Sequence, residues 1–539
     1  MIRINQLKLP VGHTQEQLAA RAAKKLRIRP EEIRTLAIRR QSLDARKKPE
    51  LFFSYVVDAE LADEARERQL VRRAGDRDVS IHEEKPYRLP KPGTAPLAHP
   101  PVIVGTGPAG LFCGLALARA GYRPVLLERG EAVDARTSRV NRFWREGVLD
   151  PDSNVQFGEG GAGTFSDGKL NTLVKDTYGR NQAVLRIFVE FGADPSILYV
   201  SKPHIGTDVL SRIVKAIREE ILRLGGEVRF ESRMTDVEVQ DGRTRSVLVN
   251  GGERIPAEAL VLALGHSARD TFQTLYDRGI PMEAKAFAMG LRIQHPQRMI
   301  DISQYGRAAG DELGPASYKV TRQVSTGRGV YSFCMCPGGY VVNASSEPGR
   351  LAVNGMSYHD RAGENANSAL IVTVSPADYA AFAGGMAEGH PLAGIAFQRE
   401  LEARAYSLGK GRIPIQLFGD FAEGKTSGGF GEVGPAFKGE WAFGNLREIL
   451  PGCISSSLSE AMGAFGHMIK GFDRPDAILA GVESRTSSPV RILRDDRMES
   501  AVKGIFPCGE GAGYAGGITS AAMDGLKTAE ELIRRYAPL

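Results

Sequence analysis

The chain has 539 residues, which is too long for one ordinary domain and predicts three or four. Its composition, 42% hydrophobic and 25% charged, is typical of a globular protein with a large core. No run of about 18 apolar residues is present, so we expect no membrane-spanning helix. The net charge of +6 lies entirely within residues 1–90, and the balanced remainder argues against a nucleic-acid partner.

The cysteines limit the classes of protein further. Their number, five, is odd, which argues against a disulfide framework, and no Cys/His cluster has zinc-binding spacing, so we expect no bound metal. The first residues, Met1 to Asn5, lack the apolar core of a signal peptide. A cytoplasmic location is therefore expected.

Residues 1–90 are predicted to form a small separate domain. Strands are expected at residues 2–9, 33–40, 51–57 and 79–83, and helices at residues 14–26 and 63–73, with Thr14 as the first helix cap. This order, βαββαβ, is the ferredoxin-like arrangement. Its basic segment at residues 39–48 is either a solvated turn or a surface that docks RNA or a protein partner. A proline-rich boundary follows at residues 86–101.

The next segment predicts a dinucleotide site. A short apolar strand, residues 101–104, leads into Gly105-Thr106-Gly107-Pro108-Ala109-Gly110 and then into a helix. Gly105 permits the tight turn, Gly107 lets the backbone approach a pyrophosphate, and Gly110 lets helix and strand pack closely. The helix start presents free amides to the phosphates. A second strand, residues 124–127, ends in Glu128 and Arg129, where the Glu128 carboxylate is expected to bind a ribose.

The C-terminal segment indicates which dinucleotide is bound. An apolar strand from residue 504 ends in Gly509-Glu510, and a glycine-rich stretch leads into a helix at residues 518–532. This pattern resembles the glutathione-reductase-like superfamily of FAD flavoproteins, although Glu510 stands where Asp is usual. The resemblance implies that Glu510 binds the ribityl chain and that the helix start, at Gly517 and Ile518, points at the flavin pyrimidine ring. Reduced flavin is negatively charged there, and a helix N-terminus stabilises such charge. The expected cofactor is FAD.

The segments between these two motifs complete the predicted fold. Residues 260–265 resemble a superfamily strand that ends in Ala-Thr-Gly; here Leu264 replaces the Thr and Gly265 ends the strand. The strands at residues 227–230 and 234–240 are expected to form a β-meander. The predicted fold class is α/β: a Rossmann-like FAD-binding domain (parallel sheet with β-meander) at residues 91–279 and 444–539, an inserted α+β substrate domain at residues 280–443, and the ferredoxin-like domain at residues 1–90.

A longer motif, from Asn154 to Leu170, follows the first βαβ unit. It resembles a signature of an uncharacterised bacterial family of FAD-dependent dehydrogenases, also called NAD(FAD)-utilising dehydrogenases. Residues 265–270, 331–339 and 483–491 support the same resemblance, which covers nearly the whole chain. It implies a flavin-dependent redox reaction and leaves the substrate open.

Flavin carries the redox chemistry, so candidate catalytic groups must lie beside its ring. The glycine-rich loop at residues 160–169 is the first candidate. Lys169 is predicted to stabilise reduced flavin or to bind an acidic substrate, with Asp167 as a further polar group; a structural or phosphate contact is the alternative. His266 is a candidate for proton transfer. The loop residues expected to contact the cofactor are Gly161, Ala162, Gly163 and Ser166.

Two further pairs of residues allow two interpretations each. Cys334 and Cys336 would share one face of a strand as a redox pair, or they are core residues. Arg485 and Arg491 would contact a carboxylate or the flavin, or act structurally. No second strand–GxGxxG–helix unit is found in the sequence. NADH or NADPH, if it is the transient electron donor, would therefore have to reach the flavin from the substrate side.

These features favour an FAD-dependent oxidoreductase of the dehydrogenase or reductase type, acting on a small-molecule substrate with non-covalently bound flavin. Two alternatives stay open. One is a flavoprotein that acts on RNA or docks a partner through the basic N-terminal domain, and the other is a non-catalytic FAD-binding protein. The sequence makes no prediction of the oligomeric state.

Overall fold

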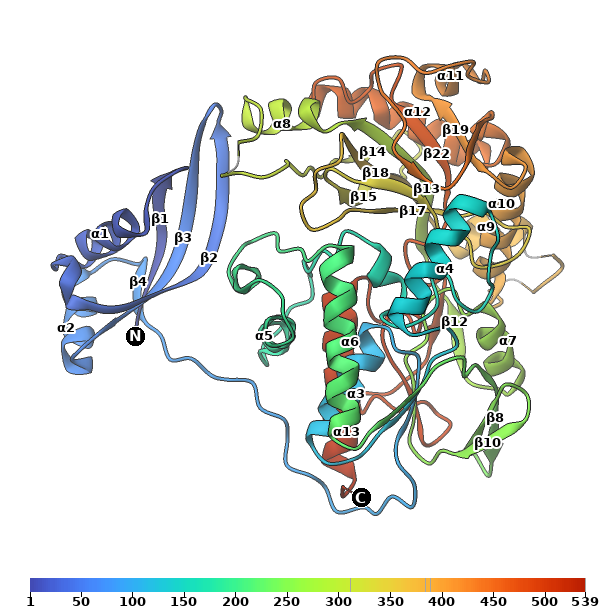
Figure 1. The fold of residues 1–539 in the computed structure, drawn as a ribbon, viewed down its shortest axis with the longest axis horizontal. Helices are drawn as coiled ribbons and strands as arrows, with labels where there is room; N and C mark the ends of the chain where they lie inside the picture. The colour runs from blue at the N-terminus through green and yellow to red at the C-terminus, as the bar shows by residue number, and fades with distance from the viewer. Residues whose placement is uncertain (311, 383, 388, 539) are drawn as a thin grey trace.

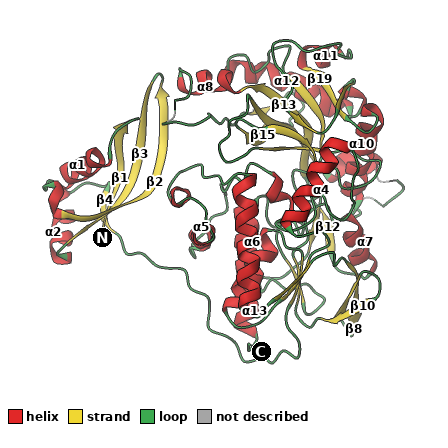
Figure 2. Ribbon diagram, in the orientation of Figure 1, coloured by secondary structure: helices red, strands yellow, loops and turns green. Residues whose placement is uncertain are grey.

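A computed structural model describes residues 1–310, 312–382, 384–387 and 389–538. The N-terminal unit stands at one side of the molecule (Figure 1). Its elements are, in chain order, β1 (Ile2–Pro10), α1 (Gln15–Leu26), η1 (Pro30–Glu32), β2 (Ile33–Lys47), β3 (Glu50–Leu61), α2 (Glu64–Ala74) and β4 (Val79–Ile81). The strands form an antiparallel sheet in the order β2-β3-β1-β4. Figure 2 shows both helices on the same side of this sheet.

Helix α1 begins at the residue that its capping signal predicts. The Thr14 hydroxyl accepts a hydrogen bond from the Gln17 amide at 3.4 Å, and the Gln17 side chain accepts one from the Thr14 amide at 3.0 Å. This reciprocal capping box satisfies two amides that would otherwise lack partners. The apolar face of α1, which includes Leu18, packs with Ile4 and Val57 in a small core that belongs to this unit alone.

The N-terminal unit is attached to the rest of the molecule by backbone pairing. The Gln41 amide donates to the Tyr199 carbonyl at 2.8 Å, and the Gln41 carbonyl accepts from the Ser201 amide at 2.9 Å. The proline-rich segment then runs along the outside of the molecule (Figure 1). It is held at the end of the last helix, where the Gly93 amide donates to the Ile533 carbonyl at 2.7 Å. This segment therefore packs against the molecule along part of its length.

A five-stranded parallel sheet is the centre of a second part of the molecule, the parallel-sheet unit. In the order β24-β11-β5-β6-β7, its strands are β24 (Ile505–Pro507), β11 (Leu260–Leu262), β5 (Val102–Val104), β6 (Val125–Leu127) and β7 (Glu227–Arg229). Successive side chains on a strand point to opposite faces. Ile103 and Val261 accordingly lie in one apolar core, while Val102 and Leu260 lie in another. The sheet is thus buried on both faces, which suits its short, wholly apolar central strands.

Helices cover one face of the parallel sheet, and an antiparallel meander covers the other. The helices are α3 (Pro108–Arg119), α5 (Arg180–Glu190), α6 (Thr207–Arg223) and α13 (Ile518–Arg535). The meander comprises β8 (Met234–Gln240), β9 (Arg243–Val249) and β10 (Glu253–Pro256), beside α7 (Arg269–Asp277). The prediction that residues 227–230 belong to the meander is wrong. Strand β7 pairs in parallel with β6, because the long helix α6 before it makes the crossover that parallel pairing requires.

The remaining part of the molecule, the mixed-sheet unit, is built on seven strands in the order β14-β15-β18-β13-β22-β19-β21. These strands are β13 (Phe287–Pro296), β14 (Thr321–Gln323), β15 (Gly329–Cys336), β18 (Asn365–Val374), β19 (Ile413–Leu417), β21 (Trp441–Phe443) and β22 (Ile478–Glu483). A smaller sheet consists of β16 (Tyr340–Asn343), β17 (Val353–Met356) and β20 (Phe437–Lys438). The helices that pack into the large core of the mixed-sheet unit include α8 (Gln297–Tyr305), α10 (Ala393–Gly409) and α12 (Gly452–Met468).

The predicted return to the cofactor-binding domain at residue 444 is too early. Helix α12 and strand β22 lie in the core of the mixed-sheet unit, where β22 pairs with β13 and β19. The apolar sequence of β22 would suit either sheet, and only its hydrogen-bonded partners distinguish them. The chain returns through a two-stranded ribbon of β12 (Met282–Ala284) and β23 (Val490–Ile492).

The remaining helices complete the fold. They are α4 (Val133–Glu146), α9 (Pro376–Tyr379), α11 (Phe418–Glu423), η2 (Gly161–Phe165), η3 (Pro195–Leu198), η4 (Ala380–Phe382) and η5 (Leu446–Glu448). Within the described ranges, no helix has both the length and the apolar character that crossing a membrane requires.

Candidate functional site

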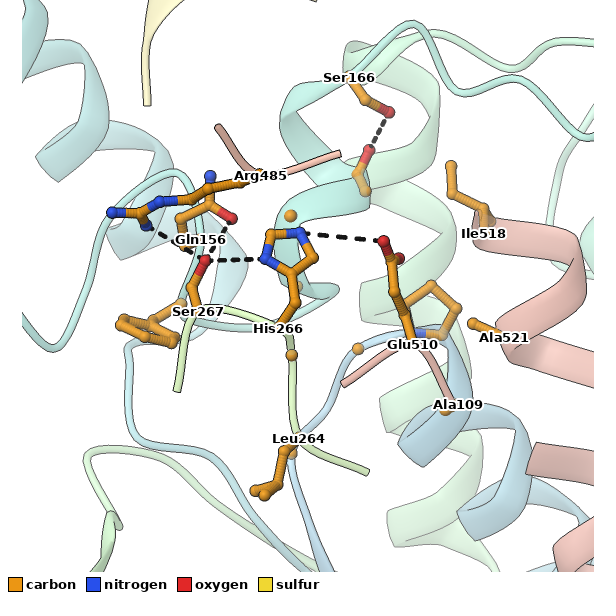
Figure 3. A pocket seen from close by; sticks show the side chains of 18 of the residues that line it. Ala109, Gln156, Ser166, Leu264, His266, Ser267, Arg485, Glu510, Ile518 and Ala521 are labelled. Carbon is orange, nitrogen blue, oxygen red and sulfur yellow. Dashed lines mark hydrogen bonds and ion pairs between the residues drawn. The ribbon is translucent and has the colours of Figure 1, made fainter. Parts of the chain in front are cut away.

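A cavity, partly open to solvent, lies between the ends of the parallel strands and the mixed sheet. Figure 3 shows how distant segments meet there, with Ala109 of α3 facing Ile518 and Ala521 of α13. The structure brings all the predicted site residues to this cavity except Gly110 and Gly509. Those on its wall are Gly105, Gly107, Pro108, Ala109, Glu128, Arg129, Gly161, Ala162, Gly163, Ser166, Asp167, Lys169, Gly265, His266, Glu510, Gly517 and Ile518.

The two predicted residues outside the cavity lie where backbones approach closely. A Cβ atom on Gly110 would lie 1.9 Å from the Gly105 carbonyl oxygen, and a Cβ atom on Gly509 would lie 2.7 Å from the Ala109 Cβ. Gly105 has a φ of +102°, a conformation that favours glycine. These glycines therefore set how closely α3 lies to the parallel strands, and through that they shape the cavity.

Helices α3 and α13 both begin at the cavity, as does α7, whose N-cap Ala268 also lies on its wall. The N-cap residue is Gly107 for α3 and Gly517 for α13, and neither helix has a side-chain hydrogen bond at its cap. A Cβ atom on Gly107 would have only the Gly161 Cα within 4 Å, at 3.9 Å, so open space lies in front of α3. The free amides and positive dipole ends make both starts suited to anionic groups. The helices pack tightly, since a Cβ on Gly525 would lie 2.2 Å from the Ala109 carbonyl oxygen.

Glu128 is buried at the position expected to bind a ribose. Its Oε2 accepts from the Thr106 amide at 2.9 Å and from the Thr106 hydroxyl at 2.8 Å. Its Oε1 accepts from the Gly158 amide at 2.9 Å and from the Gly130 amide at 3.1 Å. A carboxylate offers about four lone-pair positions. Glu128 therefore holds the two loops that flank the cavity, and a ribose hydroxyl would have to share these acceptors.

Arg129, on the same wall, is already engaged by neighbouring groups of the protein. Its guanidinium lies 4.3 Å from the centroid of the Phe157 ring, and it donates to the Asp270 carboxylate at 2.7 Å. Its charge is therefore compensated by the protein.

The loop at residues 160–170 carries both a compensated and an uncompensated charge. The Ser166 hydroxyl donates to the Gly163 carbonyl at 2.7 Å, which fixes the turn. Asp167 accepts from the Arg361 guanidinium at 2.5 and 3.0 Å and also from the Ser357 hydroxyl. Its carboxylate is thus committed to holding the loop against the mixed-sheet unit. Lys169, in contrast, has no carboxylate within ion-pair distance among the residues that the structure describes.

A row of polar side chains crosses the cavity wall (Figure 3). The Glu510 carboxylate lies 3.9 Å from His266 Nε2, and the Ser267 hydroxyl lies 3.1 Å from His266 Nδ1. Ser267 also donates to the Gln156 side-chain carbonyl at 3.1 Å. Burial, together with the charge of Arg485, lowers the pKa of His266 to about 3. Burial raises the pKa of Glu510 to about 7. Near neutral pH the imidazole is therefore uncharged, while Glu510 exchanges a proton.

Behind this row lies a buried ionic network that the sequence did not reveal. Glu402 of α10 is fully buried and pairs with Arg269 and Arg485, each at 2.8 Å. Arg269 also pairs with Glu347 at 2.6 Å. Arg485 was predicted to contact a carboxylate or the flavin, or to be structural. It lines the cavity and donates to Ser267 at 3.2 Å, but its charge is held by Glu402. No local motif marks Glu402, which lies in the middle of a helix.

The two cysteines of β15 do not share a face. A bulge interrupts the pairing between Phe333 and Cys336, and Cys334 has a φ of +42°. Cys334 is exposed at the cavity, whereas Cys336 is buried beside Arg292, whose Nη2 lies 3.4 Å from its sulfur. Burial raises the pKa of the Cys336 thiol. The reactive thiolate form is therefore disfavoured.

Comparisons with known proteins agree with the cofactor prediction at a general level. Residues 286–486 match the family model "FAD-dependent protein, C-terminal domain-like". Residues 1–60 match a domain of unknown function (DUF8436). An "Uncharacterized protein" of Clostridium beijerinckii is 48% identical over 540 residues, and the alignment covers 99% of each chain.

Solved flavoenzymes show a weaker likeness. A mutant of the E. coli quinol fumarate reductase FrdA is 13% identical, with a TM-score of 0.36, over 82% of this chain and 70% of that one. A triple mutant of the flavin-dependent brominase Bmp2 is 12% identical, with a TM-score of 0.34, over 80% and 77%. Glycine oxidase from Bacillus cereus is 11% identical, with a TM-score of 0.31, over 80% and 94%. At these values the likenesses do not bear on the reaction.

Proposed function

We propose that this chain, which belongs to the same family as the clostridial relative, is an FAD-dependent oxidoreductase acting on a small-molecule substrate. One observation carries the proposal. Two helix starts without side-chain caps, from opposite ends of the sequence, face one cavity whose walls also carry the glycine-rich loop. A dinucleotide with anionic groups at separate places along its length needs such a pair of sites.

The residues present fit FAD. Gly107 and the start of α3 would hold the pyrophosphate, where open space permits close approach. Glu128 would bind the adenosine ribose, Glu510 the ribityl chain, and the amides of Gly517 and Ile518 the pyrimidine end of the flavin. The remaining cofactor contacts would come from the other predicted residues of the wall. FAD, when bound, supplies two-electron redox chemistry.

The protein's own groups would orient the reactants and move protons. The start of α13 would stabilise negative charge on the reduced ring. Lys169 and His266 are the proposed catalytic residues, because each lines the cavity and can reach its interior. Neutral His266 and Glu510 form a pair between which a proton can be held. Asp167 would act as a positioning residue, since its carboxylate binds Arg361.

The domain organisation is proposed as follows. Residues 1–90 form the ferredoxin-like domain. The FAD-binding domain comprises residues 91 to about 285 and about 487 to 539, and the substrate domain lies between its two parts. The boundary near residue 487 is placed after β22, because β22 belongs to the mixed sheet. A small-molecule substrate, a cytoplasmic location, and NADH or NADPH as a transient electron donor stay predictions.

A glycine replacement tests the cofactor site. A Cβ at position 107 would meet only the Gly161 Cα within 4 Å, at 3.9 Å, and the rest of a leucine side chain would extend into the space before α3. The Gly107→Leu protein should fold and lack the visible absorption of bound flavin. Gly429→Leu is the matched control, because a Cβ there meets nothing within 4 Å and Gly429 is not on the cavity wall. Normal flavin content in the Gly107→Leu protein would contradict the proposed site.

Anaerobic mixing of the wild-type protein with NADH or NADPH then tests the reaction. Loss of the oxidised flavin absorption with one of them would establish a reductase half-reaction. A wild-type protein that is purified without flavin, and does not take up added FAD, would contradict the proposed function.

A further inference from the structure

Lys169 lies on the wall of the cavity, where the neighbouring charged side chains form ion pairs. Among the described residues, none of the carboxylates lies within ion-pair distance of its ammonium group. The nearest candidate in sequence, Asp167, is bound by Arg361 and Ser357. Glu483, also on the cavity wall, pairs with Arg292 at 3.0 Å. The site therefore compensates its guanidinium groups and leaves this lysine uncompensated.

A second lysine lies on the same side of the loop. Lys169 pairs with His204 in an antiparallel bridge, and the Leu170 amide donates to the Pro203 carbonyl at 3.0 Å. In such pairing the residue two before His204 lies diagonally across from Lys169 on the same face. That residue is Lys202, whose ammonium contacts the Ser317 hydroxyl at 3.1 Å. Burial and the charge of Lys169 both lower the pKa of Lys202, so the two ammonium groups repel each other.

The charge of Lys169 also acts on the two cysteines of β15. Its charge acts to lower the pKa of Cys334 and of Cys336, against the larger effect of burial. Both cysteines line the part of the cavity that β15 of the mixed-sheet unit provides. Lys169 therefore shares one cavity both with the cysteines of the mixed-sheet unit, where a substrate would approach, and with the start of α3, where a pyrophosphate would lie.

We propose that the cavity recognises its substrate by an oxyanion group, a carboxylate or a phosphate, which is bound by Lys169 and further attracted by Lys202. The proposal rests on the proposed function in treating this cavity as the substrate site. The oxyanion relieves the repulsion between the two lysines and pairs a cation that has no carboxylate partner among the described residues. A neutral substrate would leave both charges uncompensated.

Two small anions, malonate and inorganic phosphate, serve as probes, with neutral malonamide as the control. Each is titrated into the FAD-containing protein, and binding is followed by the change in the visible flavin spectrum and by calorimetry. We expect malonate or phosphate to bind and malonamide not to bind. The stronger of the two anions identifies the kind of oxyanion.

The variants are Lys169→Met, Lys169→Arg, Lys202→Met and, as a matched control, Lys527→Met on the exposed side of α13. Loss of a charge-assisted hydrogen bond should weaken anion binding about 10- to 100-fold in Lys169→Met. Lys169→Arg should restore most of the binding, Lys202→Met should weaken it a few-fold, and Lys527→Met should leave it unchanged.

Three results would overturn the inference. They are binding by Lys169→Met within twofold of wild type, no binding of either anion by the wild-type protein, and loss of FAD from Lys169→Met, which would make this lysine a cofactor contact. The proposed function fails separately, if the wild-type protein binds no FAD. Calorimetry of that flavin-free protein would still show whether Lys169 binds anions.

Discussion

Replacing Glu402 with Gln should destabilise the protein by about 3 kcal/mol, the lower end of the usual cost of breaking a buried ion pair. Glu402 has no exposed surface, and it accepts two hydrogen bonds each from Arg269 and Arg485, at 2.8 to 2.9 Å. An amide removes the negative charge from between two buried guanidinium groups. Arg269 retains Glu347 at 2.6 Å, whereas Arg485 retains only hydroxyl partners. The expected loss of stability therefore corresponds to one buried cation, Arg485, that is left without a carboxylate partner.

The measurement is the urea midpoint of the Glu402→Gln protein against Glu400→Gln. Glu400 lies on the same helix, is about half exposed, and pairs with Arg404, so its replacement should cost less than about 0.5 kcal/mol. Burial alone would raise the pKa of Glu402, but the charges of Arg269 and Arg485 hold it well below its usual range. Its stabilising effect is therefore present above about pH 4.5 and is lost as the pH falls further. Equal midpoints of the two variants at pH 7 would refute this reasoning.

Three further predictions concern other parts of the molecule. Because the pKa of Glu510 is raised to about 7, its stabilising effect is complete below about pH 4.5 and is lost as the pH rises to about 7. Between pH 5 and pH 8, the wild-type apoprotein should therefore lose melting temperature relative to the Glu510→Gln apoprotein, by the equivalent of at most about 3 kcal/mol. A difference in melting temperature between the two proteins that does not change with pH would contradict this. Gly525→Ala should cost about 1–3 kcal/mol, because the new Cβ would lie 2.2 Å from the Ala109 carbonyl oxygen, and an unchanged melting temperature would disprove the close approach. Thr14→Ala should weaken the α1 cap by about 1 kcal/mol and speed hydrogen exchange in α1 about fivefold; unchanged exchange would show that the cap is dispensable.

The parts of the fold that could be predicted are those with a local signal. Strand β5 and the glycine motif after it combine a short apolar run, fixed glycine positions and a helix start, and the same holds around Gly509. Each signal lies within about 30 residues of sequence. Many of the cavity-lining residues belong to these motifs and to the loop at residues 160–170, and these could be named from the sequence.

The features that were missed depend on partners far along the chain. The sequence of β22 indicates a buried strand, but the sheet to which it belongs depends on its pairing with β13, nearly 190 residues earlier. Glu402 is one acidic residue within a helix until folding places Arg269 and Arg485 against it. One of the two interpretations of the cysteines placed them on one face because an ideal strand alternates, and a bulge removes that alternation.

The packing of α13 on α3 also constrains how the protein is made. The two helices begin roughly 400 residues apart in the chain, so at about 5–20 residues per second α3 waits for about 20–80 seconds during synthesis before its partner exists. Over that time the apolar surface of α3 that α13 covers in the finished core lacks this protection. Strand β24, beside β11, is also delivered last. The nascent chain cannot form both helix starts of the cavity until almost all of it has left the ribosome, which makes this intermediate a natural client for chaperones.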